Sequence, residues 1–201
     1  IARVDTDVYE EGVCDPWLQA LYAEVNAQDD VLCERAFLPW PDMDEALRSA
    51  GVPLFALESR RALAEFDLLL IVLADELHIP AALTALDLAG VRWPPPARPF
   101  VVACGPGAAN PEPLAGIVHA CILGDVDALA LRETLAVLRG EGSGKPPWLW
   151  LAADDSPPSV ERRAHAPLPL PARPLVPFVE ARRERAHVDL SVPPFYPWSG
   201  G

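Results

Sequence analysis

The chain has 201 residues and a mass of 21.7 kDa, the size of one domain with an extension or of two very small domains. Hydrophobic residues make up 51% of it, enough for a buried core, and its net charge is −13. That charge argues against binding to nucleic acid or to anionic lipid, because both require a basic surface. No run of about 18 uncharged apolar residues occurs, which predicts no membrane span, and the first residues do not resemble a signal peptide.

Apolar runs and helix-capping residues alternate along the first 140 residues. Asp15 followed by Pro16 is typical of a helix start, and Asp42 and Asp127 are predicted to cap helices as well. Glycines after two of these segments are expected to end helices. The predicted strands cover residues 1–5, 31–38, 67–73, 99–104 and 120–123, and the predicted helices cover 16–25, 43–50, 80–88 and 128–138.

This alternation indicates the fold class. A continuous apolar run such as 67–73 is typical of a strand that is buried on both faces of a parallel sheet. The sequence therefore predicts a Rossmann-like, doubly wound α/β domain with a mainly parallel five-stranded sheet. Ligands of such folds bind at the carboxyl ends of the strands, which are here 5–12, 74–76, 104–110 and 124–127.

The composition changes near Gly140. Half of the 24 prolines follow it, and the excess of acidic residues is confined to residues 1–145. We therefore predict a domain over 1–140 and a Pro-rich extension over 141–201, with one further strand near 148–151. The extension has too little regular apolar patterning to form a core of its own.

The aromatic residues of the extension suggest where it packs. We expect 148–151 and 178–190 to lie on the α/β domain, and 192–198 to contact a protein partner or a second copy of the chain, because large aromatic side chains are favoured at interfaces. A frayed terminus is the alternative.

The four cysteines do not form a recognisable site. None pairs in a C-x-x-C motif, and none clusters with histidine at zinc spacing. Most of them lie in apolar runs, where buried free thiols are common in cytoplasmic proteins. The sequence therefore predicts a cytoplasmic location. The four cysteines are Cys14, Cys33, Cys104 and Cys121.

Polar residues at the predicted strand ends have two interpretations. The acidic loop Asp5, Asp7, Glu10 and Glu11 is either a divalent metal site or a solvated loop. The group Asp75-Glu76 with His78 is either acid/base machinery or a helix cap.

Three other features also have a structural alternative. The turn Gly105-Pro106-Gly107 either holds a phosphate or is purely structural, but it has neither G-x-G-x-x-G nor a Walker lysine. The pair Arg60-Arg61 either meets an anionic partner or is an ordinary surface pair. His119 is expected to have a structural role.

Several short sequence stretches resemble those of one protein family and occur in the same order as in that family. They include Asp7-Val-Tyr-Glu-Glu-Gly12, Leu38–Leu47, Pro53–Arg61, Leu86–Gly90, Gly105-Pro106 with Asn110–Pro113, and Pro174–Glu180. Over residues 2–190 the chain resembles the N-terminal cobalamin-binding-type domain of large radical S-adenosylmethionine proteins.

The resemblance implies a set of cobalamin contacts and also exposes departures from the family pattern. The implied contacts are Asp7, Tyr9, Gly12, Ala74, Gly105 and Gly124. Related corrinoid domains often carry D-x-H-x-x-G in the first loop, and Tyr9 replaces that cobalt-binding histidine here. The resemblance thus implies cobalamin without a protein imidazole on cobalt. Val72, Cys104 and Val126 depart from the pattern as well.

The chain holds no C-x-x-x-C-x-x-C motif, so we expect no iron–sulfur cluster and no radical chemistry within it. No catalytic residue and no metal ligand is assigned. Three hypotheses follow: a non-catalytic cobalamin-binding-like module, a degenerate domain that serves as a structural or assembly subunit, and an enzyme that uses the acidic strand ends. Corrinoid colour in the purified protein separates the first from the others.

Overall fold

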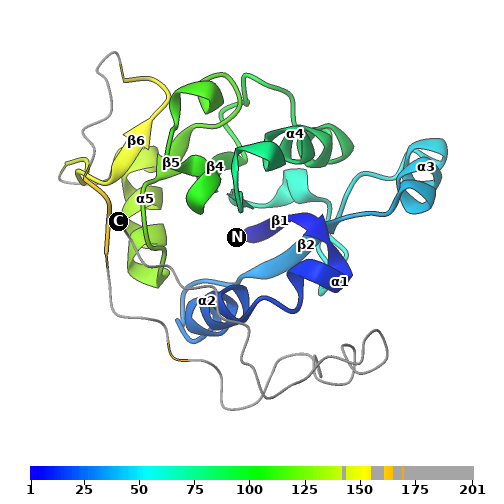
Figure 1. Ribbon diagram of the computed structural model, residues 1–201, viewed down its shortest axis with the longest axis horizontal. Helices are drawn as coiled ribbons and strands as arrows, with labels where there is room; N and C mark the ends of the chain where they lie inside the picture. The colour runs from blue at the N-terminus through cyan, green and yellow to red at the C-terminus, as the bar shows by residue number, and fades with distance from the viewer. Residues whose placement is uncertain (142–143, 155–160, 165–168, 170–201) are drawn as a thin grey trace.

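The computed structural model describes residues 1–141, 144–154, 161–164 and 169, and it contains one mixed sheet (Figure 1). The strand order is β2-β1-β3-β4-β5-β6; the first five strands are parallel, and β6 runs antiparallel to β5. The predicted Rossmann-like α/β class is therefore confirmed, with six strands in place of five. They are β1 (Ala2–Val8), β2 (Glu34–Leu38), β3 (Leu68–Val72), β4 (Phe100–Cys104), β5 (Ala120–Ile122) and β6 (Leu149–Leu151).

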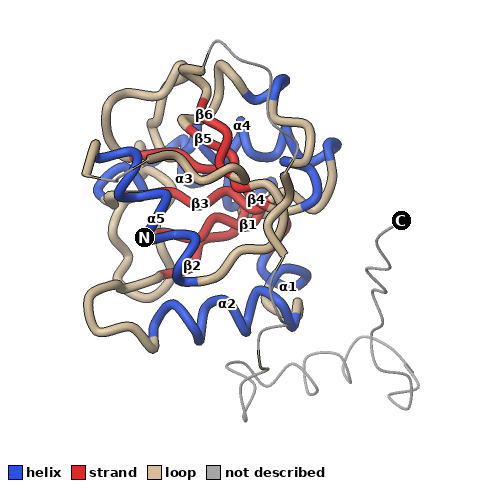
Figure 2. The backbone as a smooth tube through the Cα atoms, turned by 90° about the vertical axis from the view of Figure 1, so that its left-hand side faces the viewer, coloured by secondary structure: helices blue, strands red, loops and turns tan. Residues whose placement is uncertain are grey.

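Helices cover both faces of the sheet (Figure 2). One face packs against α2 and α5, and the other packs against α4. In Figure 1, α3 stands apart from the sheet, and only Leu47 of this helix is buried. The helices are α1 (Tyr9–Gly12), α2 (Pro16–Asn26), α3 (Pro41–Ala50), α4 (Ile79–Leu88) and α5 (Ala128–Arg139), with 3-10 turns η1 (Leu63–Glu65), η2 (Glu76–His78), η3 (Pro106–Ala108) and η4 (Glu112–Leu114).

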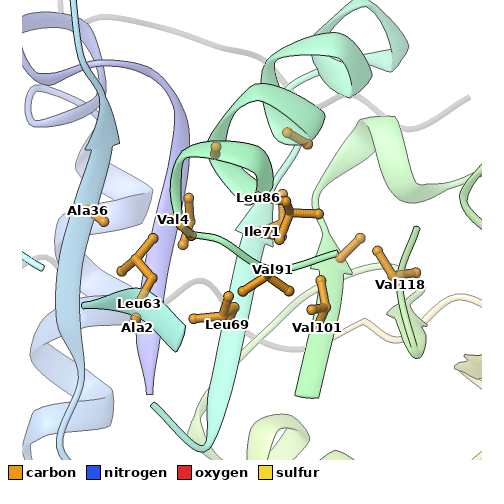
Figure 3. Packing of buried hydrophobic residues seen from close by; sticks show 14 of the residues in the cluster. Ala2, Val4, Ala36, Leu63, Leu69, Ile71, Leu86, Val91, Val101 and Val118 are labelled. Atoms are coloured by element: carbon orange, nitrogen blue, oxygen red, sulfur yellow. The ribbon is translucent and has the colours of Figure 1, made fainter. Parts of the chain in front are cut away.

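Alternate side chains of each strand enter different layers of the core. Leu69 and Ile71 of β3 pack with Leu86 of α4 (Figure 3). Leu68 and Leu70 belong to the opposite cluster, which α2 and α5 complete. This two-sided burial explains why β3 is an uninterrupted apolar run.

Two of the predicted helix caps are confirmed and one is wrong. The Asp15 carboxylate accepts from the backbone N–H of Trp17 at 2.8 Å, and that of Asp127 accepts from Ala130 at 2.7 Å. Asp42, however, lies inside the first turn of α3, because Pro41 takes the first helical position and Trp40 the N-cap.

The second strand begins later than predicted, at residue 34. The side chain of Asn26 pairs with the backbone of Cys33, accepting its N–H at 2.9 Å and donating to its carbonyl at 3.0 Å. These two bonds occupy the groups that would otherwise extend the strand ladder. The first strand is longer than predicted and continues to Val8.

The segment beyond the predicted boundary at residue 140 contributes to the same sheet. Its strand β6 pairs with β5, and Trp150 is buried in the core. Of the other predictions for the extension, those on 178–190 and 192–198 lie outside the described residues. No helix in the part of the chain that the structure describes is long and apolar enough to cross a membrane.

All four cysteines lie among the described residues, none is in a disulfide, and three of them are fully buried. Burial raises the pKa of Cys33 to about 11 and that of Cys104 to about 12, and it also raises the pKa of Cys121. We expect these three thiols not to react with Ellman's reagent in the folded protein and to react fully in concentrated urea. Fast reaction of more than one thiol under native conditions would contradict this packing.

Candidate functional site

The candidate site lies at the carboxyl edge of the sheet, between β1 and β3. The chain leaves β1 for β2 on one side and then crosses to β3 on the other, so the connections diverge at this point. Open α/β sheets bind ligands at such a switch point. The predicted contacts Asp7, Tyr9 and Ala74 are exposed here, and 41% of the Tyr9 surface is accessible.

His78 joins the two sides of the switch point. Its Nδ1 atom lies 2.8 Å from Oδ1 of Asp75, and its Nε2 atom lies 3.4 Å from Oδ1 of Asp7. Asp75 also caps η2 by accepting from the N–H of Leu77 at 2.8 Å. Asp75 therefore acts as a cap, as one sequence interpretation held, and it also orients the imidazole. Sequence spacing did not reveal the partnership with Asp7, because that residue lies 71 positions away.

The charges at this contact shift two pKa values. Partial burial of His78 lowers its pKa, but its hydrogen bond with Asp75 and the negative charges of Asp7 and Asp75 outweigh this effect, so the pKa lies above 6.5. The hydrogen bond from His78 lowers the pKa of Asp75 below 3.8. The imidazole is thus held in a negative environment.

Directly below this edge, β1 carries a buried ion pair. Arg3 donates to Asp5 at 2.6 Å and to the carbonyl of Leu18 at 2.5 Å, and both ionic side chains are 2% exposed. Burial raises the pKa of Asp5 from 3.8 to about 6, and the nearby Arg3 offsets part of that rise. The carboxylate of Asp5 therefore pairs with Arg3 inside the protein and does not reach the exposed edge.

The first loop packs closely against Phe37 of β2. Gly12 is buried, and a Cβ atom there would run into the ring of Phe37. Tyr9 meets the same ring edge-on, with 5.2 Å between the ring centroids. Gly12 thus allows α1 to lie on Phe37, which leaves Tyr9 at the surface of the loop.

The glycines after β4 bring two loops together. A Cβ atom on Gly105 would overlap the carbonyl of Leu73, and one on Gly107 would overlap the carbonyl of Asp75. The N–H of Gly107 donates to Leu73 at 3.1 Å. These contacts support the structural interpretation of the Gly-Pro-Gly turn and fix the loop that carries His78.

Gly124, after β5, is covered by residues 161–164. The carbonyl of Leu123 accepts from the N–H of Arg163 at 2.8 Å, and the N–H of Asp125 donates to the carbonyl of Arg163 at 2.9 Å. The Arg163 guanidinium also pairs with Asp127 at 2.6 Å. This strap is held by both backbone and side chains, and no pattern in the sequence indicated it.

The acidic residues of the first loop do not converge. Asp5 faces Arg3, Asp7 faces His78, and Glu10 accepts from Nε1 of Trp40 at 3.0 Å. Among the residues that the structure describes, no three His, Cys, Asp or Glu side chains are arranged to hold a metal ion.

The remaining candidates have structural contacts. His119 accepts from the N–H of Val101 at 2.9 Å, and burial lowers its pKa, as expected for a structural imidazole. Arg61 pairs with Glu65 and lies over the ring of Phe66. Arg60 adopts φ of 60° at the turn.

The fold and the open edge define a doubly wound α/β domain of the kind that binds ligands at its switch point. Residues 18–147, almost two thirds of the chain, match the family described as radical SAM proteins, N-terminal. The chain belongs to this family.

A solved structure shows a more distant likeness. It is that of the radical S-adenosylmethionine methyltransferase TsrM from Kitasatospora setae, with a tryptophan substrate and a SAM analog bound. The identity is 13% and the TM-score 0.49, over 84% of this chain and 35% of that chain. This chain therefore spans about a third of the length of that enzyme. No curated protein matches the chain in sequence.

Proposed function

We propose that this chain is a non-catalytic corrinoid-binding module that takes cobalamin at the carboxyl edge between β1 and β3. The observation that carries this proposal is the exposed group Asp7, Tyr9 and Ala74 at the switch point, with an oriented imidazole beside it. The family membership supports it, since the match over residues 18–147 includes Ala74 and the rest of the loop after β3.

An aromatic side chain at this edge suits a corrinoid. The exposed part of Tyr9 offers a surface on which a flat macrocycle can lie. A bound corrinoid supplies a reactive cobalt centre. In this proposal the residues of the chain bind and orient the cofactor, and none of them is assigned a catalytic role.

A structural or assembly role is the second candidate, and a specific observation favours it. Gly105 and Gly124, two of the predicted contacts, lie against the backbone of Leu73 and Arg163. Space that a cofactor tail would need near these glycines is thus taken by the chain itself. The two glycines remain predicted contacts, and in the described structure they have packing roles.

Titration with hydroxocobalamin, followed by equilibrium dialysis and visible absorption, separates the two functions. We expect saturable binding at micromolar concentration, and a roughly tenfold loss of affinity on Tyr9→Ala, because one aromatic contact is removed. Asp67→Ala is a matched control, since Asp67 is an exposed carboxylate just before β3, at the opposite edge of the sheet. No binding at high micromolar concentration would favour the structural role.

A further inference from the structure

The two walls of the switch point are anchored to different neighbours. The loop after β1 leans on β2, because Tyr9 and Gly12 both pack against the ring of Phe37. The loop after β3 leans on β4, since the N–H of Leu73 donates to the carbonyl of Cys104 at 2.9 Å. Neither of these sets of contacts joins one wall to the other.

A single imidazole reaches across the gap between the walls. Below the edge, Thr6 ties the two strands together, with its Oγ1 atom donating to the carbonyl of Val72 at 2.7 Å. At the edge itself, Nε2 of His78 lies 3.4 Å from Oδ1 of Asp7, and Nδ1 lies 2.8 Å from Oδ1 of Asp75. Asp7 stands near the end of β1 and Asp75 in the loop after β3, so His78 bridges the two walls.

The protonation state of the ring decides the sign of this bridge. An imidazolium carries a proton on both nitrogens, so it donates to Asp75 and attracts Asp7. A neutral ring keeps its proton on Nδ1, because the Asp75 carboxylate only accepts hydrogen bonds. Its Nε2 lone pair then faces the lone pairs of the Asp7 carboxylate, which repel it. The contact with Asp7 is thus attractive only while the ring is charged.

The charges that act on the ring are those of the two bridged carboxylates. Asp75 and Asp7 raise the pKa of His78 above 6.5, against the effect of partial burial. Two other segments pack against the turn that carries His78, and neither has a titratable side chain; they are Pro106–Ala108 of η3 and residues 79–82 of α4. Glu76, in the same turn, is exposed.

We propose that His78 is a proton-operated clasp, whose imidazolium holds Asp7 and the loop after β1 against the loop after β3, and that loss of the proton releases Asp7 and opens the switch point. The inference goes beyond the proposed function, since it concerns the opening of the edge and not the ligand that enters. The clasp is complete below pH 6.5, the ordinary pKa of histidine. It is lost as the pH rises through the higher pKa that His78 has in the fold.

Titration of the histidine rings, followed by ¹H–¹³C nuclear magnetic resonance, tests the electrostatic part. We expect the pKa of His78 to be lower in Asp7→Asn than in the wild type, because one attracting carboxylate is removed. Glu76→Gln is the matched control. It removes one negative charge from the same turn but no atom of the clasp, so it should lower the pKa of His78 less. An unchanged pKa in Asp7→Asn would overturn the role of Asp7.

Hydrogen exchange of backbone amides tests the opening itself. The amides of residues 13–15 report on α1, because they donate to the carbonyls of Tyr9, Glu11 and Gly12. Their protection factors, which correct for the intrinsic pH dependence of exchange, are measured from about pH 5 to about pH 9, across the histidine titration. We expect protection to fall about two- to fivefold over this range, the effect of one exposed ion pair. Amides of β4 should not change.

His78→Gln, which cannot take up a proton, should show the lower protection at every pH, and Asp7→Asn should behave in the same way. Equal protection of residues 13–15 in the wild type and both variants at low pH would overturn the clasp. A fall with pH that persists in His78→Gln would also overturn it, because another group would then be titrating. No corrinoid enters these measurements, so failure of hydroxocobalamin to bind would overturn the proposed function and leave the clasp intact.

Discussion

Replacement of Asp5 by asparagine is expected to lower the free energy of unfolding by about 3–5 kcal/mol. The substitution leaves the guanidinium of Arg3 buried without a compensating charge, and that side chain is 2% exposed. Chemical denaturation in urea, monitored by circular dichroism, measures the loss. A change below about 1 kcal/mol would show that the pair is solvated and that Arg3 has another partner.

The double variant Arg3→Met/Asp5→Leu is the control. Apolar residues of similar size in place of a buried ion pair are often neutral or stabilising by about 1–4 kcal/mol, because two charges no longer have to be desolvated. We expect the unfolding free energy of the double variant to be close to that of the wild type. The gain from removing two buried charges offsets the loss of the hydrogen bond from Arg3 to the Leu18 carbonyl. Loss of stability in both variants would indicate that the shape of the ion pair matters more than its charge.

Replacement of Gly105 by alanine is expected to lower the free energy of unfolding by about 2–6 kcal/mol. About 1–3 kcal/mol comes from the backbone, whose φ of 91° and ψ of 178° suit only glycine. A further amount of about 1–3 kcal/mol comes from overlap of the new Cβ atom with the carbonyl of Leu73. The melting temperature and the urea midpoint should both fall.

Gly116→Ala is the matched control, since nothing lies within 4 Å of a Cβ atom there and its φ is ordinary. It should change stability by about 0.5 kcal/mol or less. A loss for Gly105→Ala as small as that for Gly116→Ala would contradict the close packing of the loops after β3 and β4. Because these loops carry the candidate site, the same variant should also weaken corrinoid binding.

Local patterns were sufficient to predict most of the fold. Asp15 and Asp127 cap their helices because a short acidic side chain reaches the free N–H groups of the first turn wherever it stands at that position. The apolar run of β3 is buried on both faces. Asp42 was mispredicted because Pro41 beside it competes for the helix start, and Cys33 was mispredicted because Asn26 takes its backbone groups.

The candidate site was harder to predict from sequence than the fold, because it depends on contacts between residues far apart in the chain. Asp7 and His78 meet only after β1 and β3 have paired, and the strap at Arg163 meets Gly124 only through the completed sheet. Glycines are ambiguous for the same physical reason. A missing side chain admits a cofactor or a neighbouring backbone equally well, and Gly105 admits the backbone of Leu73.

Amide chemical-shift mapping with hydroxocobalamin tests most directly whether the carboxyl edge between β1 and β3 binds a corrinoid. ¹⁵N–¹H spectra of the chain should show saturable shifts at residues 7–12 and 73–78, and smaller ones or none at residue 67 and at the C-terminal end of α5. Shifts confined to the opposite edge of the sheet, or spectra unchanged at high concentrations of hydroxocobalamin, would contradict corrinoid binding at the edge between β1 and β3.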